Sequence, residues 1–179
     1  MRLLRLLILP VLALAATADD WSEPAHVLHE LKPVVTYRAK IDGSWLIVET
    51  TIQPGWHTFA IDNERRAAEK LAGKASLGID QPTRFQVANG LEVAGPWYQR
   101  EPQDFSKPQL RWYSWGFEGQ TTFAAKVKRT GSGPANIGIR GQACTDKTCK
   151  NIDVSLAVAV PAAQNSSDPA VVKGLVEAR

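Results

Sequence analysis

The sequence predicts an all-β protein of the immunoglobulin-like sandwich class, with one short helix inserted among the strands. Three observations support this prediction. Apolar and polar residues alternate along most segments after residue 34, turn-forming residues separate these segments, and only one convincing helical segment lies among them. Seven or more short strands joined by turns are typical of a β-sandwich. A parallel α/β fold is disfavoured because it needs helices between most successive strands.

The first two predicted strands form a hairpin. Every second residue from 35 to 41 is apolar, and Asp42-Gly43 follows, a pair that favours a tight turn because both positions tolerate positive φ. The return strand is 45–52, with Leu46, Val48 and Ile52 on one face. Further candidate strands are 56–61, 83–87, 111–117, 121–128, 137–143 and 152–160.

One helix is expected between the strands, with Asn63 as N-cap, good helix formers at 64–72 and Gly73 at the C′ position. A second, short helix is expected to begin at Asp168-Pro169. The stretch 95–111 contains several prolines and aromatic residues without a clean period, so we predict a long ordered loop, a kind of segment that is often functional.

The N-terminus has the three parts of a secretory signal peptide. Arg2 and Arg5 supply the positive charge, residues 6–14 are almost wholly apolar, and Ala16-Thr17-Ala18 offers a small-residue cleavage site. The apolar run is shorter than the about 20 residues that a membrane span needs. We therefore expect a signal peptide at 1–18 and a periplasmic or otherwise exported protein that is soluble and not membrane-spanning; the alternative is an uncleaved N-terminal anchor.

The rest of the chain suits one domain. We divide it into an N-terminal extension (19–33), the sandwich domain (34–161) and a polar linker with a short C-terminal helix (162–179). Without residues 1–18 the chain carries 19 basic and 18 acidic residues. Such a balance leaves no electrostatic footprint for nucleic acid, so we expect no nucleic-acid partner.

The chain has two cysteines, Cys144 and Cys149, between two predicted strands. Two cysteines in an exported protein normally form a disulfide. Their spacing leaves two roles open. One role is a structural staple, which contributes only about 2 kcal/mol to stability when it closes so short a loop, on the chain-entropy model. The other role is thiol–disulfide exchange.

Other chemistries find little support in the sequence. A structural zinc site needs about four ligands, whereas His26 and His29 are distant from the thiols in sequence. His57 follows Trp56 in a predicted strand and is interpreted as a packed or edge histidine. No Ser/His/Asp arrangement and no phosphate-binding glycine loop is recognisable, so we expect no metal and no cofactor.

Three motifs follow one another along the chain. They are Gly55-Trp56-His57-Thr58-Phe59, Gly78-Ile79-Asp80-Gln81-Pro82-Thr83, and Gln142-Ala143-Cys144 with Cys149. By their order and spacing, the chain resembles the N-terminal periplasmic domain of the thiol:disulfide interchange protein DsbD. The resemblance covers approximately residues 30–160.

This resemblance implies an immunoglobulin-like sandwich that relays reducing equivalents through Cys144 and Cys149. It implies a thioredoxin-like or membrane thiol reductase as electron donor. The implied acceptor is an oxidised periplasmic protein, such as a disulfide isomerase or a protein of cytochrome c maturation. Cys149 is the expected attacking thiolate and Cys144 the resolving one. The family covers its disulfide with an aromatic cap loop, and Phe105 is the expected shield here, with Tyr113 and Trp97 as neighbours.

The chain departs from the family in two respects. Lys150-Asn151 follows the second cysteine where the family often has proline, and the membrane segment and C-terminal thioredoxin-like domain are absent from the sequence. The resemblance therefore does not define the direction of electron flow. The alternative function is an immunoglobulin-like binding or assembly module with a purely structural disulfide, in which tryptophans form a recognition surface for a peptide or glycan.

Overall fold

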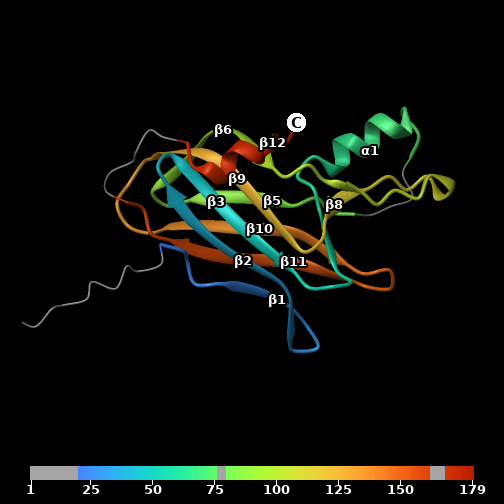
Figure 1. Cartoon of the computed structure of the whole chain (residues 1–179), viewed down its shortest axis with the longest axis horizontal. Helices are drawn as coiled ribbons and strands as arrows, with labels where there is room; N and C mark the ends of the chain where they lie inside the picture. Colours follow the sequence, from blue (N-terminus) through green and yellow to red (C-terminus); the bar gives the residue numbers. More distant parts are fainter. Residues whose placement is uncertain (1–19, 76–79, 162–167) are drawn as a thin grey trace, which may run out of the picture.

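The computed structural model of the protein describes residues 20–75, 80–161 and 168–179. Two antiparallel β-sheets pack face to face, and one α-helix, α1 (Asn63–Leu71), lies at one end of them (Figure 1). The predicted immunoglobulin-like sandwich is thereby confirmed. The expected signal peptide (1–18) and the linker residues 162–167 lie outside the described residues.

The first sheet has the strand order β1-β2-β3-β9-β6-β12. Its strands are β1 (Ala25–His29), β2 (Lys32–Asp42), β3 (Trp45–Ile52), β9 (Gln120–Arg129), β6 (Leu91–Gln99) and β12 (Val176–Glu177). The second sheet has the order β11-β10-β4-β8-β7, and β5 also pairs with β10. Its strands are β11 (Cys149–Val158), β10 (Ala135–Cys144), β4 (His57–Phe59), β8 (Trp115–Phe117), β7 (Gln103–Asp104) and β5 (Arg84–Ala88).

The main core lies between the two sheets and follows the predicted alternation. In β2, Val35, Tyr37 and Ala39 are fully buried, and in β11 Ile152 and Leu156 are nearly so. Burying one large aliphatic or aromatic side chain contributes about 1.5–3 kcal/mol. The period-two pattern therefore supplies much of the driving force that holds the sheets together.

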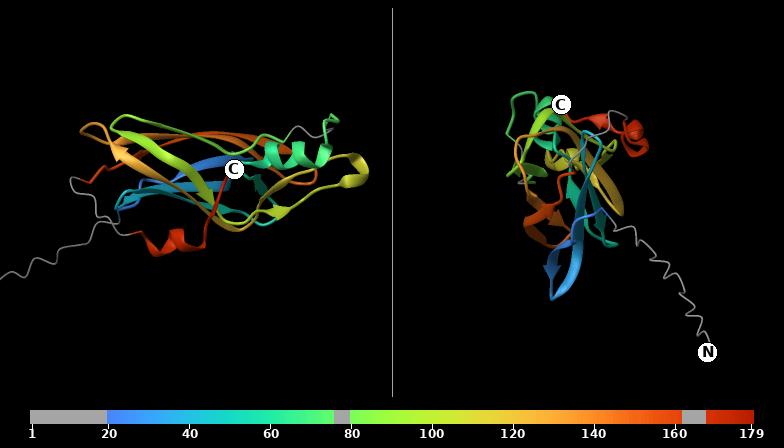
Figure 2. Two further views of the ribbon diagram at one scale, coloured as in Figure 1. Left: turned by 90° about the horizontal axis from the view of Figure 1, so that it is seen from above. Right: turned by 90° about the vertical axis from the view of Figure 1, so that its left-hand side faces the viewer.

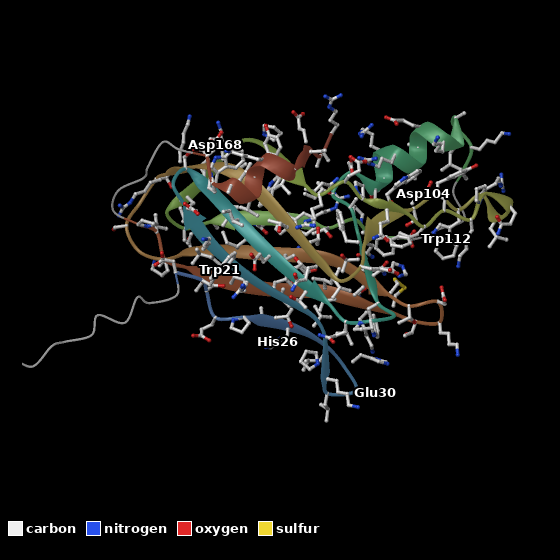
Figure 3. The ribbon with its side chains drawn as sticks, in the orientation of Figure 1. Trp21, His26, Glu30, Asp104, Trp112 and Asp168 are labelled. Atoms are coloured by element: carbon white, nitrogen blue, oxygen red, sulfur yellow. A yellow bond between two sulfur atoms is a disulfide. The ribbon has the colours of Figure 1, made fainter. Side chains whose placement is uncertain are left out.

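The strand β3 is buried on both faces, which its alternation does not predict. Trp45 and Ile47 pack against the C-terminal segment, where the Trp45 indole Nε1 donates to Asp168 Oδ1 at 2.8 Å. Figure 3 labels Asp168 on this segment. Val172 and Leu175 pack against the same cluster. The expected C-terminal helix is a 3₁₀ helix (Ala170–Gly174), and the short strand β12 follows it along β6.

Two predicted boundaries are corrected. The stretch treated as an N-terminal extension contains β1, and β2 begins at Lys32, so the sandwich starts before residue 34. The first part of the predicted loop 95–111 continues β6 as far as Gln99. Its pairing with β9 shifts register between Val93 and Trp97, and such an irregularity accommodates Pro96, which has no N–H to donate.

The expected N-cap role of Asn63 is wrong, because Asp62 occupies that position. The Asp62 carboxylate is buried and accepts hydrogen bonds from Arg66 Nε at 2.8 Å and Gln99 Nε2 at 2.7 Å. Asn63 Oδ1 instead accepts from the Trp115 backbone N–H at 2.7 Å. The polar side chains that begin α1 thus attach it to β6 and β8.

Strands β4 and β8 approach so closely that only glycine fits at position 116. A Cβ atom there would lie 1.9 Å from the Thr58 carbonyl oxygen. This contact matters for function because β4 and β8 lie at the end of the sandwich that also carries α1 and the tip of the β10–β11 hairpin (Figure 2).

We predict that Gly116→Ala lowers the free energy of unfolding by about 1–3 kcal/mol, because the added methyl group forces β4 and β8 apart. Urea denaturation measures this difference. The matched control is Gly95→Ala in β6, where a Cβ meets no atom within 4 Å; its effect should stay within about 0.5 kcal/mol. Equal effects of the two substitutions would contradict the steric argument.

Candidate functional site

Cys144 and Cys149 form a disulfide at the turn end of the β10–β11 hairpin. Cys144 ends β10 and Cys149 begins β11, directly opposite in the antiparallel register, with Cα atoms 4.0 Å apart. In the turn between them the Thr145 N–H donates to the Thr148 carbonyl oxygen at 2.8 Å. Thr145 Oγ1 accepts from the backbone N–H groups of Lys147 and Thr148, both at 3.1 Å. The turn is therefore closed by hydrogen bonds of its own.

The two cysteines differ sharply in exposure. Cys144 is 3% exposed, because β10 lies between β11 and β4 at this point, whereas Cys149 belongs to the exposed residues. A thiol that approaches from solvent therefore meets Cys149 first. This asymmetry distinguishes the two sulfurs chemically, since exchange depends on which sulfur is accessible.

A cavity of about 220 Å³ adjoins the disulfide and is called the disulfide cavity below. Its walls come from β4, the segment before β5, the loop between β7 and β8, the turn after β8, and the cysteine hairpin. Its lining includes four rings and four charged side chains. The rings are those of His57, Phe59, Phe105 and Trp112, and the charged side chains are Asp80, Lys107, Glu118 and Asp146.

The loop between β7 and β8 carries Phe105 to this cavity. The Phe105 N–H donates to the Ser114 carbonyl oxygen at 2.8 Å. The Phe105 ring then lies with its centroid 4.9 Å from that of His57, at an interplanar angle of 35°. Farther along the loop Trp112 Nε1 donates to Asp80 Oδ2 at 2.6 Å, at the α1 end of the molecule (Figure 3). These bonds hold the aromatic loop against the site.

The other two expected shield residues lie elsewhere. Trp97 belongs to β6, and its ring stacks on Phe85 with centroids 4.2 Å apart. Tyr113 packs against the main core and lines a separate cavity of about 160 Å³ beside α1. Among the described residues that line the disulfide cavity, Phe105 is thus the one member of the expected aromatic trio.

Sequence reasoning missed His57, Asp80 and Trp112 as residues of this site. The sequence places His57 and Phe59 on one face of a strand, but the position of His57 beside Cys144 depends on the pairing of β4 with β10. Asp80 and Trp112 gave no comparable signal, since their hydrogen bond joins segments 32 residues apart.

Burial determines the charge of the imidazole. Desolvation lowers the pKa of His57 below its ordinary value of 6.5. The carboxylates of Asp80, Glu118 and Asp146 act in the opposite direction, and Lys107 adds to the lowering. Because desolvation is the largest effect, His57 is neutral at pH 7 in the folded protein.

The described residues hold neither a candidate metal cluster nor a helix that could span a membrane. No group of three or more His, Cys, Asp and Glu side chains is arranged to hold a metal ion within residues 20–75, 80–161 and 168–179. In the same ranges, every helix is too short or too polar to span a bilayer.

Comparisons with known proteins bear on the fold. No protein-family model matches the chain, and no curated protein matches its sequence. Among solved structures, the N-terminal periplasmic domain of ScsB from Proteus mirabilis is similar at a TM-score of 0.51 and 14% identity, over 78% of this chain and 51% of that one. The DsbD N-terminal domain from Neisseria meningitidis, in the reduced form, gives a TM-score of 0.49 at 11% identity, over 71% of this chain and 86% of that one.

The ScsB likeness confirms the fold that the resemblance in sequence implies, and at this identity it extends to the fold alone. The chain spans about half the length of the ScsB domain structure that it matches.

We predict that the free energy of unfolding decreases as the pH falls through about 6.5. The unfolded chain takes up a proton on His57 there, whereas the folded state, with its lowered pKa, does so only at a lower pH. The contribution of His57 to the free energy of unfolding is therefore fully present above the pKa of the unfolded chain. It is lost as the pH falls from that value toward the lower pKa of the folded state. Urea denaturation of the oxidised protein between pH 8 and 5 measures it. In His57→Gln the free energy of unfolding should depend less on pH in this range. If it fell equally in the variant and in the unaltered protein, the pH dependence would not come from His57.

Proposed function

We propose that this protein is a periplasmic thiol:disulfide interchange module that relays reducing equivalents through Cys144 and Cys149 to oxidised exported proteins. The observation that supports this function most strongly is the asymmetry of the disulfide. One sulfur belongs to an exposed residue and the other to a residue that is 3% exposed, at the turn end of a hairpin beside an aromatic-lined cavity.

A purely structural role explains the position of this disulfide less well. The β10–β11 ladder runs without interruption from Ala135↔Val158 to Cys144↔Cys149, and Thr145 closes the turn. The bond thus joins two residues that the backbone already holds together. It closes a very short loop, for which the chain-entropy model gives only about 2 kcal/mol. It also joins neighbours within one sheet and leaves the two sheets unlinked.

The exchange needs two steps. In the first, the Cys149 thiolate of the reduced protein attacks one sulfur of the acceptor's disulfide. A bond forms between these sulfurs, the acceptor's own S–S bond breaks, and its leaving thiolate takes up a proton. In the second, the Cys144 thiolate attacks Cys149 Sγ, which restores the internal disulfide and releases the acceptor's other thiol. Two electrons and two protons reach the acceptor, and a thioredoxin-like or membrane thiol reductase then reduces Cys144–Cys149 again.

Phe105 serves this function as a shield. Its ring lies over His57 and lines the disulfide cavity beside both cysteines. Because exchange depends on access to sulfur, a ring at this position slows attack by small thiols relative to attack by a partner that displaces the loop.

The alternative, a binding module that uses a tryptophan surface, loses support from the burial of these side chains. Trp45, Trp56 and Trp115 are buried, and the other three tryptophans are half-buried. All six lie in the described part of the chain, and none of them is among its exposed residues.

We predict that reduced Cys144→Ser captures partners from a periplasmic extract as mixed disulfides through Cys149, because the resolving thiol is missing. Mass spectrometry after alkylation of free thiols identifies the adducts. Cys149→Ser is the matched control and should capture none, since Cys144 is buried. Equal capture by both variants, or adducts through Cys144 alone, would contradict the assigned roles.

A further inference from the structure

Three side chains stand in a row across three strands at the disulfide. Cys149 of β11 is directly opposite Cys144 of β10, and Cys144 is directly opposite His57 of β4. Residues opposite one another in an antiparallel pair project from the same face, with Cβ atoms about 4.5–5.5 Å apart. His57 therefore flanks Cys144 on the side away from Cys149, and all three residues line the disulfide cavity.

We propose that His57 accepts the proton of the Cys144 thiol when Cys144 resolves the mixed disulfide. This inference rests on the proposed function and assigns one of its proton transfers. The Cys144 S–H bond breaks, its proton moves to an imidazole nitrogen of His57, and the thiolate attacks Cys149 Sγ. The Cys144–Cys149 bond forms, the bond between Cys149 and the acceptor breaks, and the imidazolium returns the proton to the leaving thiolate.

The buried cysteine is the one that needs a base. The thiolate, and not the thiol, is the nucleophile in exchange. Cys149 is exposed, so water can receive its proton. Cys144 is only 3% exposed, and its ladder neighbours on the two sides are Cys149 and His57. Of these two neighbours, only the imidazole is a proton acceptor once Cys149 is bonded to the acceptor protein.

The surroundings of His57 suit a base that is neutral at rest. The Phe105 ring lies tilted against the imidazole, and the Phe59 ring meets it at 90° with centroids 5.3 Å apart, so both rings exclude water. Burial lowers the pKa of His57, which leaves a nitrogen lone pair free at pH 7.

The charges that face His57 favour the imidazolium once it has formed. Asp80 precedes β5, Glu118 follows β8 and Asp146 belongs to the cysteine turn; all three carboxylates raise its pKa, while Lys107 of the β7–β8 loop lowers it. Three negative groups against one positive group stabilise a transient positive charge in this cavity.

The test uses Ellman's reagent, a small aromatic disulfide, with the reduced full-length protein in single-turnover stopped flow. Attack by Cys149 releases one coloured thiolate, and resolution by Cys144 releases a second, so the two steps appear as two phases. Cys144→Ser should keep only the first phase, which assigns them. In His57→Gln we expect the second phase to slow about 100-fold, as for loss of a general base, while the first keeps its rate.

The pH dependence separates a proton acceptor from a structural role. In the unaltered protein the rate of the second phase should level off once His57 is neutral. In His57→Gln it should keep rising with pH until the thiol itself ionises. Free imidazole should restore part of the rate to His57→Ala. The control is His26→Gln, an exposed histidine on β1 outside the disulfide cavity, which should leave both phases unchanged. Near-ultraviolet circular dichroism checks that each variant is folded.

Two results would overturn the inference, and a third would overturn the proposed function on which it rests. A second phase of unchanged rate in folded His57→Gln would exclude His57 as the proton acceptor. Equal slowing of both phases without imidazole rescue would assign His57 to holding the hairpin. Failure of the unaltered reduced protein to release any coloured thiolate would instead overturn the proposed function itself.

Discussion

The backbone register of the β10–β11 hairpin is the constraint on which the rest of the site depends. Because side chains alternate between the two faces of a sheet, a slip of one residue would place Cys144 and Cys149 on opposite faces and prevent the bond. The ladder that begins at Ala135↔Val158 fixes this register through buried side chains such as Ile137 and Leu156. Hydrophobic burial far from the sulfurs thus determines where they meet.

The neighbouring strands then make the two sulfurs unequal. Strand β4 covers Cys144 on one side, and the close approach of β4 to β8 at Gly116 keeps β4 in place. Cys149 has no such cover and is exposed. The loop between β7 and β8 adds Phe105 above His57. The same hairpin without these additions would carry a disulfide with two equivalent ends, and exchange would have no preferred point of attack.

Much of the fold was predictable from the sequence, because burial on one face imposes a period of two on strands such as β2 and β11. The extension of β6 through Pro96 was not predictable. Proline has no N–H to donate to the neighbouring strand, and only the assembled sheet shows that a shift of register with β9 accommodates this residue. The cysteine pair was evident from its position between two strands. The part played by His57 depends on the pairing of β4 with β10, which joins residues that are far apart in the chain. No local pattern reveals such a pairing.

The central claim is that the Cys144–Cys149 bond opens and closes in the folded protein under physiological thiol conditions. The reduction potential of the bond tests it most directly, measured by equilibration with thiol and disulfide glutathione mixtures while circular dichroism follows folding. We expect a potential above about −300 mV with the sandwich intact in both redox states. A potential below that value, or reduction only on unfolding, would show that the bond is an inert part of the scaffold.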